Sequence, residues 1–175
     1  NKIFVFYNSK SENRIGYFKS ELVEAISPKY FNNKKKTTSL LSLSSILNLL
    51  LPESQPYKKL FISVESFLKD LELEYWASSY VYWELNLLKE LGFDPYLEQF
   101  SKDLDENINY KIIEIDNIKY QVPIFLFKKK TKLVINNKNI LSGLSFTRSL
   151  LSNKFFLPNN LVFPKARIIL ENYFN

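Results

Sequence analysis

The residue with the most demanding chemistry in this sequence is a glutamate inside an apolar segment. Glu84 lies in the stretch YVYWELNLLKELGF at 80–93, and its neighbours one helical turn away are apolar or aromatic. A carboxylate in such surroundings needs a cation or several hydrogen-bond donors. The sequence has three arginines, one of which, Arg14, lies in the expected β-segment at residues 1–27. We therefore expect Glu84 to pair with Arg148 or Arg167, in a structural rather than a catalytic role.

Several kinds of catalytic chemistry are excluded by composition. Cysteine and histidine are both absent, which removes disulfides, thiol nucleophiles, Cys/His metal sites and imidazole acid–base catalysis. The three glycines are isolated, so no glycine-rich phosphate loop exists. We expect no enzymatic activity, no cofactor and no metal.

Two lysine clusters are candidates for contact with the phosphates of nucleic acid. They comprise Lys34, Lys35 and Lys36, and then Lys128, Lys129, Lys130 and Lys132. Lysines neutralise backbone phosphates without reading bases. Tyr30 and Phe31 lie beside the first cluster and Phe125 and Phe127 beside the second, where aromatic rings could stack on unpaired bases. The alternative is that these rings belong to the core and the lysines are ordinary solvated residues.

The charge is concentrated at one end of the chain. The net charge is +6, and residues 119–175 hold ten basic residues against one acidic residue. Such a one-sided field favours a polyanion, either nucleic acid or an acidic peptide. A solvated lysine-rich surface is the simpler alternative.

The first 27 residues have the pattern of β-structure. Residues 2–7 predict one strand, and residues 15–26 predict a second strand with a bulge at Gly16. Two strands do not make a stable unit. We therefore expect residues 1–27 to be the last strands of a β-barrel whose first strands are missing.

Helical patterns dominate the rest of the chain. After a basic linker at 28–36, Thr37 or Thr38 is expected to cap a helix that ends before Pro52. Further helices are expected at 56–73 and 76–91, the last ended by Gly92 in a left-handed conformation.

The remaining elements are a hairpin and two helices. Residues 110–122 alternate on both sides of Asp116–Asn117, which predicts a β-hairpin. The last helices are expected at 142–152 and 164–174. The fold class is thus α+β and mainly α, with a helical domain at 37–175 that carries a small β-hairpin insertion.

Membrane insertion is not expected. No apolar run reaches the ~18 residues that a transmembrane helix needs, and the first residues lack the features of a signal peptide. We expect a cytoplasmic protein.

Four motifs, in this order and spacing, resemble the RecO family of bacterial recombinational repair proteins. They are LPE-x-x-P at 51–56, the helix at 80–93, FTR at 146–148 and PKAR at 164–167. The resemblance implies that residues 1–27 are the closing strands of an incomplete OB-fold and that 37–175 are the family's helical domain.

The chain departs from the family pattern at two places. The zinc cysteines found in many members would begin near Phe100 and are absent, so we expect no zinc. Many members also place a basic residue ahead of the aromatic–Glu pair, where this chain has Val81 and Tyr82.

The resemblance also implies function and partners. RecO proteins bind single- and double-stranded DNA, anneal single strands and help load RecA onto DNA coated by single-stranded DNA-binding protein, and they are nucleoid-associated. The implied protein partners are RecR and the acidic, Phe-terminated tail of the coating protein. That tail would suit a groove rimmed by Arg148, Arg167 or the lysines at 128–132. The alternative is a helical module that binds acidic partner peptides and has little DNA binding of its own.

Overall fold

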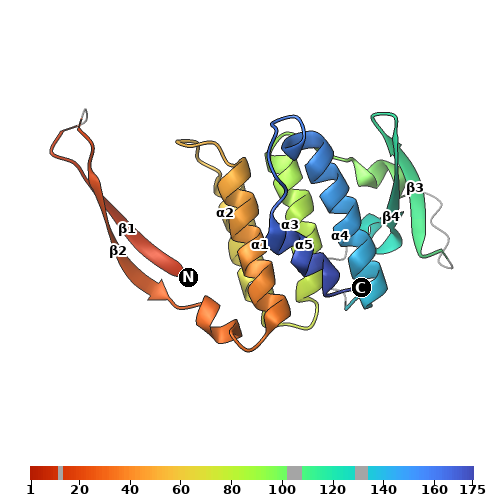
Figure 1. The fold of residues 1–175 in the computed structure, drawn as a ribbon, viewed down its shortest axis with the longest axis horizontal. Coiled ribbons are helices and arrows are strands. Elements are labelled where there is room, and N and C mark those ends of the chain that lie inside the picture. Colours follow the sequence, from red (N-terminus) through yellow and green to blue (C-terminus); the bar gives the residue numbers. More distant parts are fainter. Residues whose placement is uncertain (12–13, 102–107, 129–133) are drawn as a thin grey trace.

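The computed structural model describes residues 1–11, 14–101, 108–128 and 134–175. These residues form five α-helices, short 3₁₀ and π segments, and two antiparallel sheets of two strands each (Figure 1). The mainly helical α+β class predicted from the sequence is confirmed.

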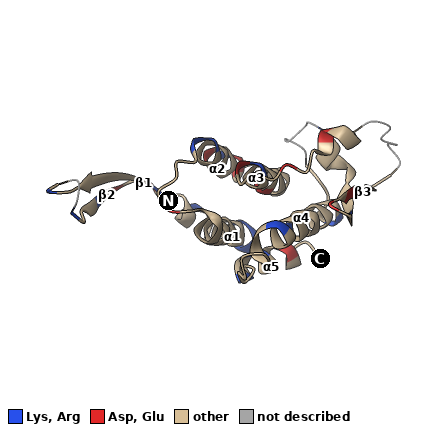
Figure 2. Cartoon of the chain, turned by 90° about the horizontal axis from the view of Figure 1, so that it is seen from above, with Lys and Arg blue, Asp and Glu red and all other residues tan. Residues whose placement is uncertain are grey.

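The helices pack in two layers, which Figure 2 shows from above. One layer holds α2 and α3, and the other holds α1, α4 and α5, with α1 against α5 and α4 against α3. Their bounds are α1 Lys34–Leu50, α2 Lys58–Asp70, α3 Trp76–Glu90, α4 Asn137–Leu151 and α5 Lys165–Asn172.

Asparagine side chains cap two of these helices. Asn33 caps α1 by accepting a hydrogen bond from the Lys36 backbone N–H at 3.1 Å, and Asn136 caps α4 in the same way. The predicted start of the first helix at Thr37 or Thr38 is therefore wrong. Thr37 instead donates its hydroxyl to the Tyr30 carbonyl at 2.6 Å.

The end of α3 follows the sequence prediction. Gly92 has φ +94°, a backbone conformation that side chains disfavour. The Gly92 N–H donates to the Lys89 carbonyl at 3.0 Å and the Phe93 N–H to the Leu88 carbonyl at 2.9 Å. These two bonds form a Schellman motif, so the predicted helix stop at Gly92 is confirmed.

Strands β1 (Lys2–Asn8) and β2 (Tyr17–Glu24) form a ribbon that projects from the helical layers (Figure 1). Every residue of the two strands is exposed. At the base, the Asn1 Oδ1 accepts hydrogen bonds from the backbone N–H groups of Ile26 and Ser27 at 3.0 and 3.1 Å. Lys2 also forms an ion pair of 2.6 Å with Glu65 of α2.

The bulge predicted at Gly16 is wrong, because the irregular register lies between Lys2 and Ile3. Gly16 has a different reason to be glycine. A Cβ atom there would lie 2.4 Å from the Asn8 carbonyl oxygen and 2.6 Å from the Tyr7 ring.

Strands β3 (Tyr110–Ile115) and β4 (Ile118–Pro123) form the second hairpin, which packs on α4. Asp116 and Asn117 both have positive φ, 51° and 64°, as a type I′ turn requires. Tyr120 and Val122 are buried, and the Tyr120 ring meets the Phe146 ring edge-on at 5.8 Å. The hairpin predicted from the sequence is confirmed.

The last two helices are also found, with shifted ends. Helix α4 begins at Asn137, five residues before the predicted start, because Asn136 is its cap. It continues into a π segment at Ser152–Phe156, and Pro164 precedes α5. Among the described residues, no helix is long and apolar enough to cross a membrane.

Candidate functional site

The Glu84 carboxylate joins the two helical layers. Arg167 of α5 donates from Nε to Glu84 Oε1 at 2.6 Å and from Nη2 to Oε2 at 3.0 Å, and the Thr147 hydroxyl of α4 donates to Oε2 at 2.5 Å. The side chains of Glu84 and Arg167 are fully buried. The pairing predicted from the sequence is confirmed, and it is Arg167 rather than Arg148 that makes it.

This ion pair is fully hydrogen-bonded. Arg167 also donates to the Leu144 carbonyl at 2.7 Å and to Glu171 at 3.2 Å. Burial alone would lower the pKa of Arg167, but the neighbouring Glu84, Tyr80 and Glu171 outweigh it and raise the pKa above its ordinary value. The guanidinium therefore stays charged, and the bidentate geometry favours one packing of α3, α4 and α5.

Arg167 cannot rim a groove for a partner peptide. Its side chain has no exposed surface, so the predicted role in peptide contact is wrong for this residue. Burial against Glu84 is the physical reason. Arg148 differs, because its side chain is 42% exposed while its Nε lies 3.5 Å from the Glu171 carboxylate.

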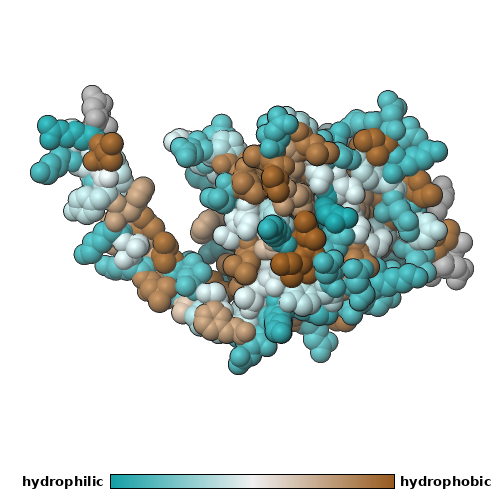
Figure 3. All heavy atoms as spheres, viewed as in Figure 1, coloured by the Kyte–Doolittle hydropathy of each residue, from teal (hydrophilic) through white to brown (hydrophobic). Residues whose placement is uncertain are grey.

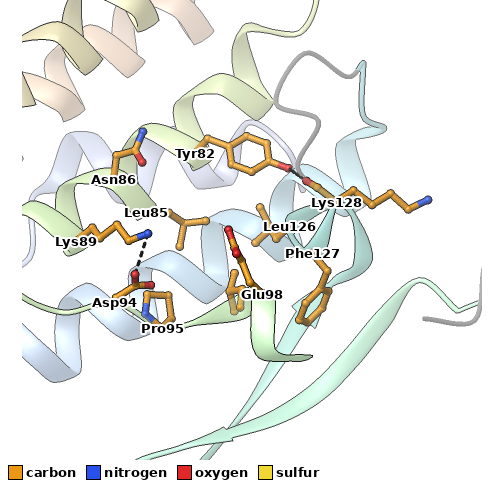
Figure 4. A pocket seen from close by; sticks show the side chains of 11 residues that line it. Tyr82, Leu85, Asn86, Lys89, Asp94, Pro95, Glu98, Leu126, Phe127 and Lys128 are labelled. Atoms are coloured by element: carbon orange, nitrogen blue, oxygen red, sulfur yellow. Dashed lines mark hydrogen bonds and ion pairs between the residues drawn. The ribbon is translucent and has the colours of Figure 1, made fainter. Parts of the chain in front are cut away.

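A cleft of about 200 Å³ lies between α3 and two 3₁₀ segments, η2 (Leu97–Phe100) and η3 (Ile124–Phe127) (Figure 4). Leu85, Leu126 and Phe127 give it apolar walls. Its charged residues are Lys89, Asp94, Glu98 and Lys128. The cleft combines an apolar interior with charged groups at its edge, an arrangement suited to a small amphipathic ligand such as a peptide end.

Tyr82 of α3 is one of the residues that line this cleft, and its hydroxyl links α3 to η3. Its hydroxyl donates to the Phe125 carbonyl at 2.7 Å and approaches the Lys128 carbonyl at 3.2 Å. Burial raises the pKa of Tyr82 to about 12. The phenol is therefore protonated at neutral pH. Val81, the other residue at the family's basic position, is fully buried.

The first lysine cluster lies in the first turn of α1. Lys34 is exposed, whereas the Lys35 ammonium lies 4.7 Å from the centre of the Phe174 ring and that of Lys36 lies 5.5 Å from the Tyr30 ring. No acidic residue lies in this first turn. The three lysine charges repel one another and the positive end of the helix dipole, so this turn attracts anions.

The second cluster is described only at its start. Lys128 is exposed at the rim of the cleft, and Lys129, Lys130 and Lys132 lie outside the described residues. Lys128 follows η3, so the described start of the second cluster lies on a different element from the first cluster, which is on α1.

The aromatic residues beside the lysine clusters mostly belong to the core. Tyr30, Phe125 and Phe127 are 6–7% exposed, so stacking of these rings on bases is ruled out by their packing. Phe31 is 68% exposed and remains accessible.

A larger set of exposed aromatic rings lies on the β1–β2 ribbon. The sequence predicts strands there but does not identify these rings as candidate site residues. Its exposed aromatic residues are Phe4, Phe6, Tyr7, Tyr17 and Phe18, and Figure 3 shows apolar side chains along the ribbon. The run of five apolar residues from Ile3 to Tyr7 is the feature of the sequence that could have indicated exposed rings. A single hairpin cannot bury both faces of such a strand.

In the part of the chain that the structure describes, no group of three or more Asp and Glu side chains comes close enough together to hold a metal ion.

Comparison with known proteins gives consistent matches. Residues 33–102 match the family described as recombination protein O C terminal. The DNA repair protein RecO of Wolbachia sp. subsp. Drosophila simulans (strain wRi) is 28% identical over 97% of this chain and 78% of its own length. That of Wolbachia pipientis subsp. Culex pipiens (strain wPip) is 28% identical over 99% and 79%, and that of Anaplasma marginale (strain Florida) is 31% identical over 50% and 37%. No solved structure matches the chain.

Proposed function

We propose that this chain, which is similar to RecO DNA repair proteins over nearly its whole length and matches their C-terminal family model at residues 33–102, is a non-enzymatic recombination factor that binds and anneals single-stranded DNA. In this proposal it helps load RecA onto DNA coated with single-stranded DNA-binding protein, and it works in the cytoplasm, at the nucleoid. A role in DNA repair and recombination follows from the family itself; the finer steps are the proposal.

The β1–β2 ribbon is the observation that carries DNA binding. Phe4 and Phe6 are 53% and 44% exposed on one strand, and their ring centres are 4.6 Å apart. Exposed rings on a strand give stacking surfaces for unpaired bases, whatever the base. Basic residues Lys10, Arg14 and Lys19 on the same ribbon supply charge for the phosphates.

The lysines of the first turn of α1 support the same proposal. Lys34, Lys35 and Lys36 add to the positive end of a 17-residue helix, so a phosphate near this turn would relieve their mutual repulsion. These contacts carry no sequence information. The binding is therefore expected to depend on salt and to tolerate many base sequences.

Titration of a fluorescent single-stranded oligonucleotide tests this function. We expect binding at low salt that weakens about tenfold or more at moderate salt, because counterions are released from the phosphates. Phe6→Ala should weaken binding about tenfold through lost stacking. Phe61→Ala is the matched control, because Phe61 is an exposed phenylalanine outside the ribbon, on α2, with 61% exposure against 44% for Phe6.

Absence of binding at low salt would contradict the DNA-binding proposal. Equal losses for Phe6→Ala and Phe61→Ala would contradict the role of the ribbon. Replacement of Lys34, Lys35 and Lys36 by glutamine should make the affinity less dependent on salt. The slope of log affinity against log salt should fall by the amount expected for the loss of up to three phosphate contacts.

A second function is favoured by the cleft on α3. We propose that it docks an acidic partner peptide with an apolar end, such as the tail of single-stranded DNA-binding protein, with RecR as a further partner of the chain. The apolar walls of Leu85, Leu126 and Phe127 suit the apolar end, and Lys89 and Lys128 suit acidic groups. Of the two arginine candidates, Arg148 on α4 is the one with an exposed side chain, and it lies outside the residues that line the cleft.

Fluorescence anisotropy separates the two functions. Binding of a labelled acidic peptide with a C-terminal phenylalanine, lost in Lys128→Gln, would support the cleft. The oligonucleotide titration on the same variant should be unchanged if DNA binds the ribbon and α1. A chain that binds the peptide and no DNA would be mainly a protein-interaction module.

A further inference from the structure

Lys89, one of the two lysines of the cleft, already holds a carboxylate from its own chain. Its ammonium lies 2.8 Å from Asp94 Oδ2, with the two side chains 59% and 24% exposed. Figure 4 shows this pair at one end of the cleft, beside Pro95. The hydrogen bond to Asp94 raises the pKa of Lys89, so the lysine is a permanent cation at this position.

The chain reversal after α3 places Asp94 there. The Schellman motif at Gly92 turns the chain back, and the Asp94 Oδ1 accepts a hydrogen bond from the Tyr96 backbone N–H at 2.9 Å. Tyr96 has φ 48°, a left-handed conformation. Asp94 is thus held by one oxygen on the backbone while the other faces Lys89, which makes it a preformed partner rather than a chance contact.

The charges of the cleft balance. Lys89 and Lys128 stand against Asp94 and Glu98, all four of which line it. An acidic ligand that reaches Lys89 meets a cation that Asp94 already partly neutralises, so its carboxylate gains less than it would from an unpaired lysine. A ligand with one carboxylate therefore gains little at this lysine.

We propose that Asp94 is an internal counter-ion that occupies Lys89 in place of a ligand carboxylate, and that it determines which peptides the cleft accepts. This inference rests on the proposed docking of acidic peptides in the cleft. Asp94 disfavours weakly acidic peptides and selects those that combine several carboxylates with an apolar end. It is a specificity-determining residue, since it tunes the charge that the ligand meets.

Asp94→Asn is a sharp test, because it removes the charge and keeps the side-chain oxygen that accepts from Tyr96. The probe is a fluorescein-labelled peptide of four aspartates that ends in phenylalanine, followed by anisotropy. We expect Asp94→Asn to bind it at least five times more tightly than the natural sequence and with a steeper dependence on salt. The same substitution should increase the affinity for a peptide with a single aspartate by a larger factor.

Asp116→Asn is the matched control. It removes the same charge from an aspartate that also pairs with a lysine, Lys154, in the β3–β4 turn. We expect no change in peptide affinity. Lys89→Gln should weaken binding, and the double variant Lys89→Gln/Asp94→Asn should bind no better than Lys89→Gln alone.

The outcomes distinguish the inference from the function it rests on. Suppose that the natural sequence binds the peptide and that Asp94→Asn, with an unchanged melting temperature, binds it equally well or more weakly. That result overturns the role of Asp94 but leaves the proposed docking function in place. An equal gain in peptide affinity from Asp116→Asn would also overturn the role of Asp94, since the gain would then come from the change in net charge. Failure of every variant to bind the peptide overturns the docking function and the inference together.

Discussion

Both antiparallel hairpins of this chain are built from β-branched and aromatic residues, yet only β3–β4 buries any of them. In β3–β4 the apolar side chains Ile113, Tyr120 and Val122 are buried. In β1–β2 all residues of both strands are exposed. The difference lies in what packs against each hairpin, because β4 lies on α4 whereas the ribbon touches the helices only near its base.

That comparison separates two uses of apolar surface. Burial in β3–β4 stabilises the fold, at roughly 25 cal/mol for each Å² removed from water. An exposed apolar surface such as that of the ribbon marks a place where another molecule or another part of the protein packs. We therefore expect substitutions in the helical layers and β3–β4 to change stability, and substitutions in the ribbon to change binding.

The largest effect is expected from Glu84→Ala. It leaves the fully buried Arg167 without its carboxylate, and loss of one partner of a buried pair costs about 3–5 kcal/mol in the free energy of unfolding. Guanidinium unfolding followed by circular dichroism measures it. Glu65→Ala, which removes the exposed ion pair at the ribbon base, should change stability little. Similar losses for both variants would make the ribbon an integral part of the fold.

The same substitution in each hairpin tests the comparison most directly. Val122 is fully buried and Val5 is 45% exposed. Val122→Ala should lower the free energy of unfolding by about 2 kcal/mol through lost transfer energy and a cavity. Val5→Ala should change it by less than about 0.5 kcal/mol. Equal costs, measured in urea, would show that β1 is buried in solution by something else.

A smaller effect concerns the hydrogen bond by which Tyr82 of α3 holds η3, next to β4. Tyr82→Phe should lower the free energy of unfolding by about 1 kcal/mol, because the Phe125 carbonyl loses the shorter of its two hydrogen bonds and keeps only the one from the Lys128 N–H. Thermal unfolding at neutral pH measures this loss. An unchanged melting temperature would mean that water replaces the hydroxyl.

The same phenol gives a pH dependence of known sign. Its pKa is about 12 in the folded chain and about 10 when unfolded, so the burial contributes stability that is complete below pH 10. That contribution is lost as the pH rises from 10 through 12, because the unfolded chain ionises first. Titration of tyrosinate absorbance should show several late-titrating phenols, because burial also raises the pKa of Tyr30 and Tyr80, and Tyr82→Phe should remove one of them.

The smallest effect is expected in the β3–β4 turn. Asn117 has φ 64°, a conformation that glycine adopts at no cost. Asn117→Gly should raise the free energy of unfolding by a few tenths of a kcal/mol. Asn117→Ala should lower it by about 1 kcal/mol, since alanine disfavours left-handed backbone. A gain from alanine would mean that this turn relaxes to another type.

Local features were predictable from the sequence. For a contact between distant residues, the sequence indicated only a choice of possible partners. Gly92 and Asp116–Asn117 were placed correctly, because a turn depends on a few adjacent residues. The start of α1 was missed because Asn33, the sixth residue of the expected linker at 28–36, caps it. For Glu84 the sequence required a cation and left two arginines open.

The candidate sites were less predictable than the fold. Lys128 was identified as basic, but the cleft beside it depends on α3, η2 and η3 meeting in space. Asp94 gave no signal, because its role comes from a chain reversal that brings it against Lys89. The exposed rings of the ribbon were read as strand residues, since exposure cannot be judged without the elements that would cover them.

The sequence by itself determined the positions of the turns, the lack of cysteine and histidine chemistry, and the requirement for a cation near Glu84. These depend on residue types and on neighbours a few positions away. Only the tertiary structure decided that Arg167, 83 positions from Glu84, is that cation. It also decided that Phe125 and Phe127 are buried while Phe4 and Phe6 are not. The physical reason is that burial and charge pairing depend on which distant elements pack together, and a strand pattern is the same whether or not anything covers it.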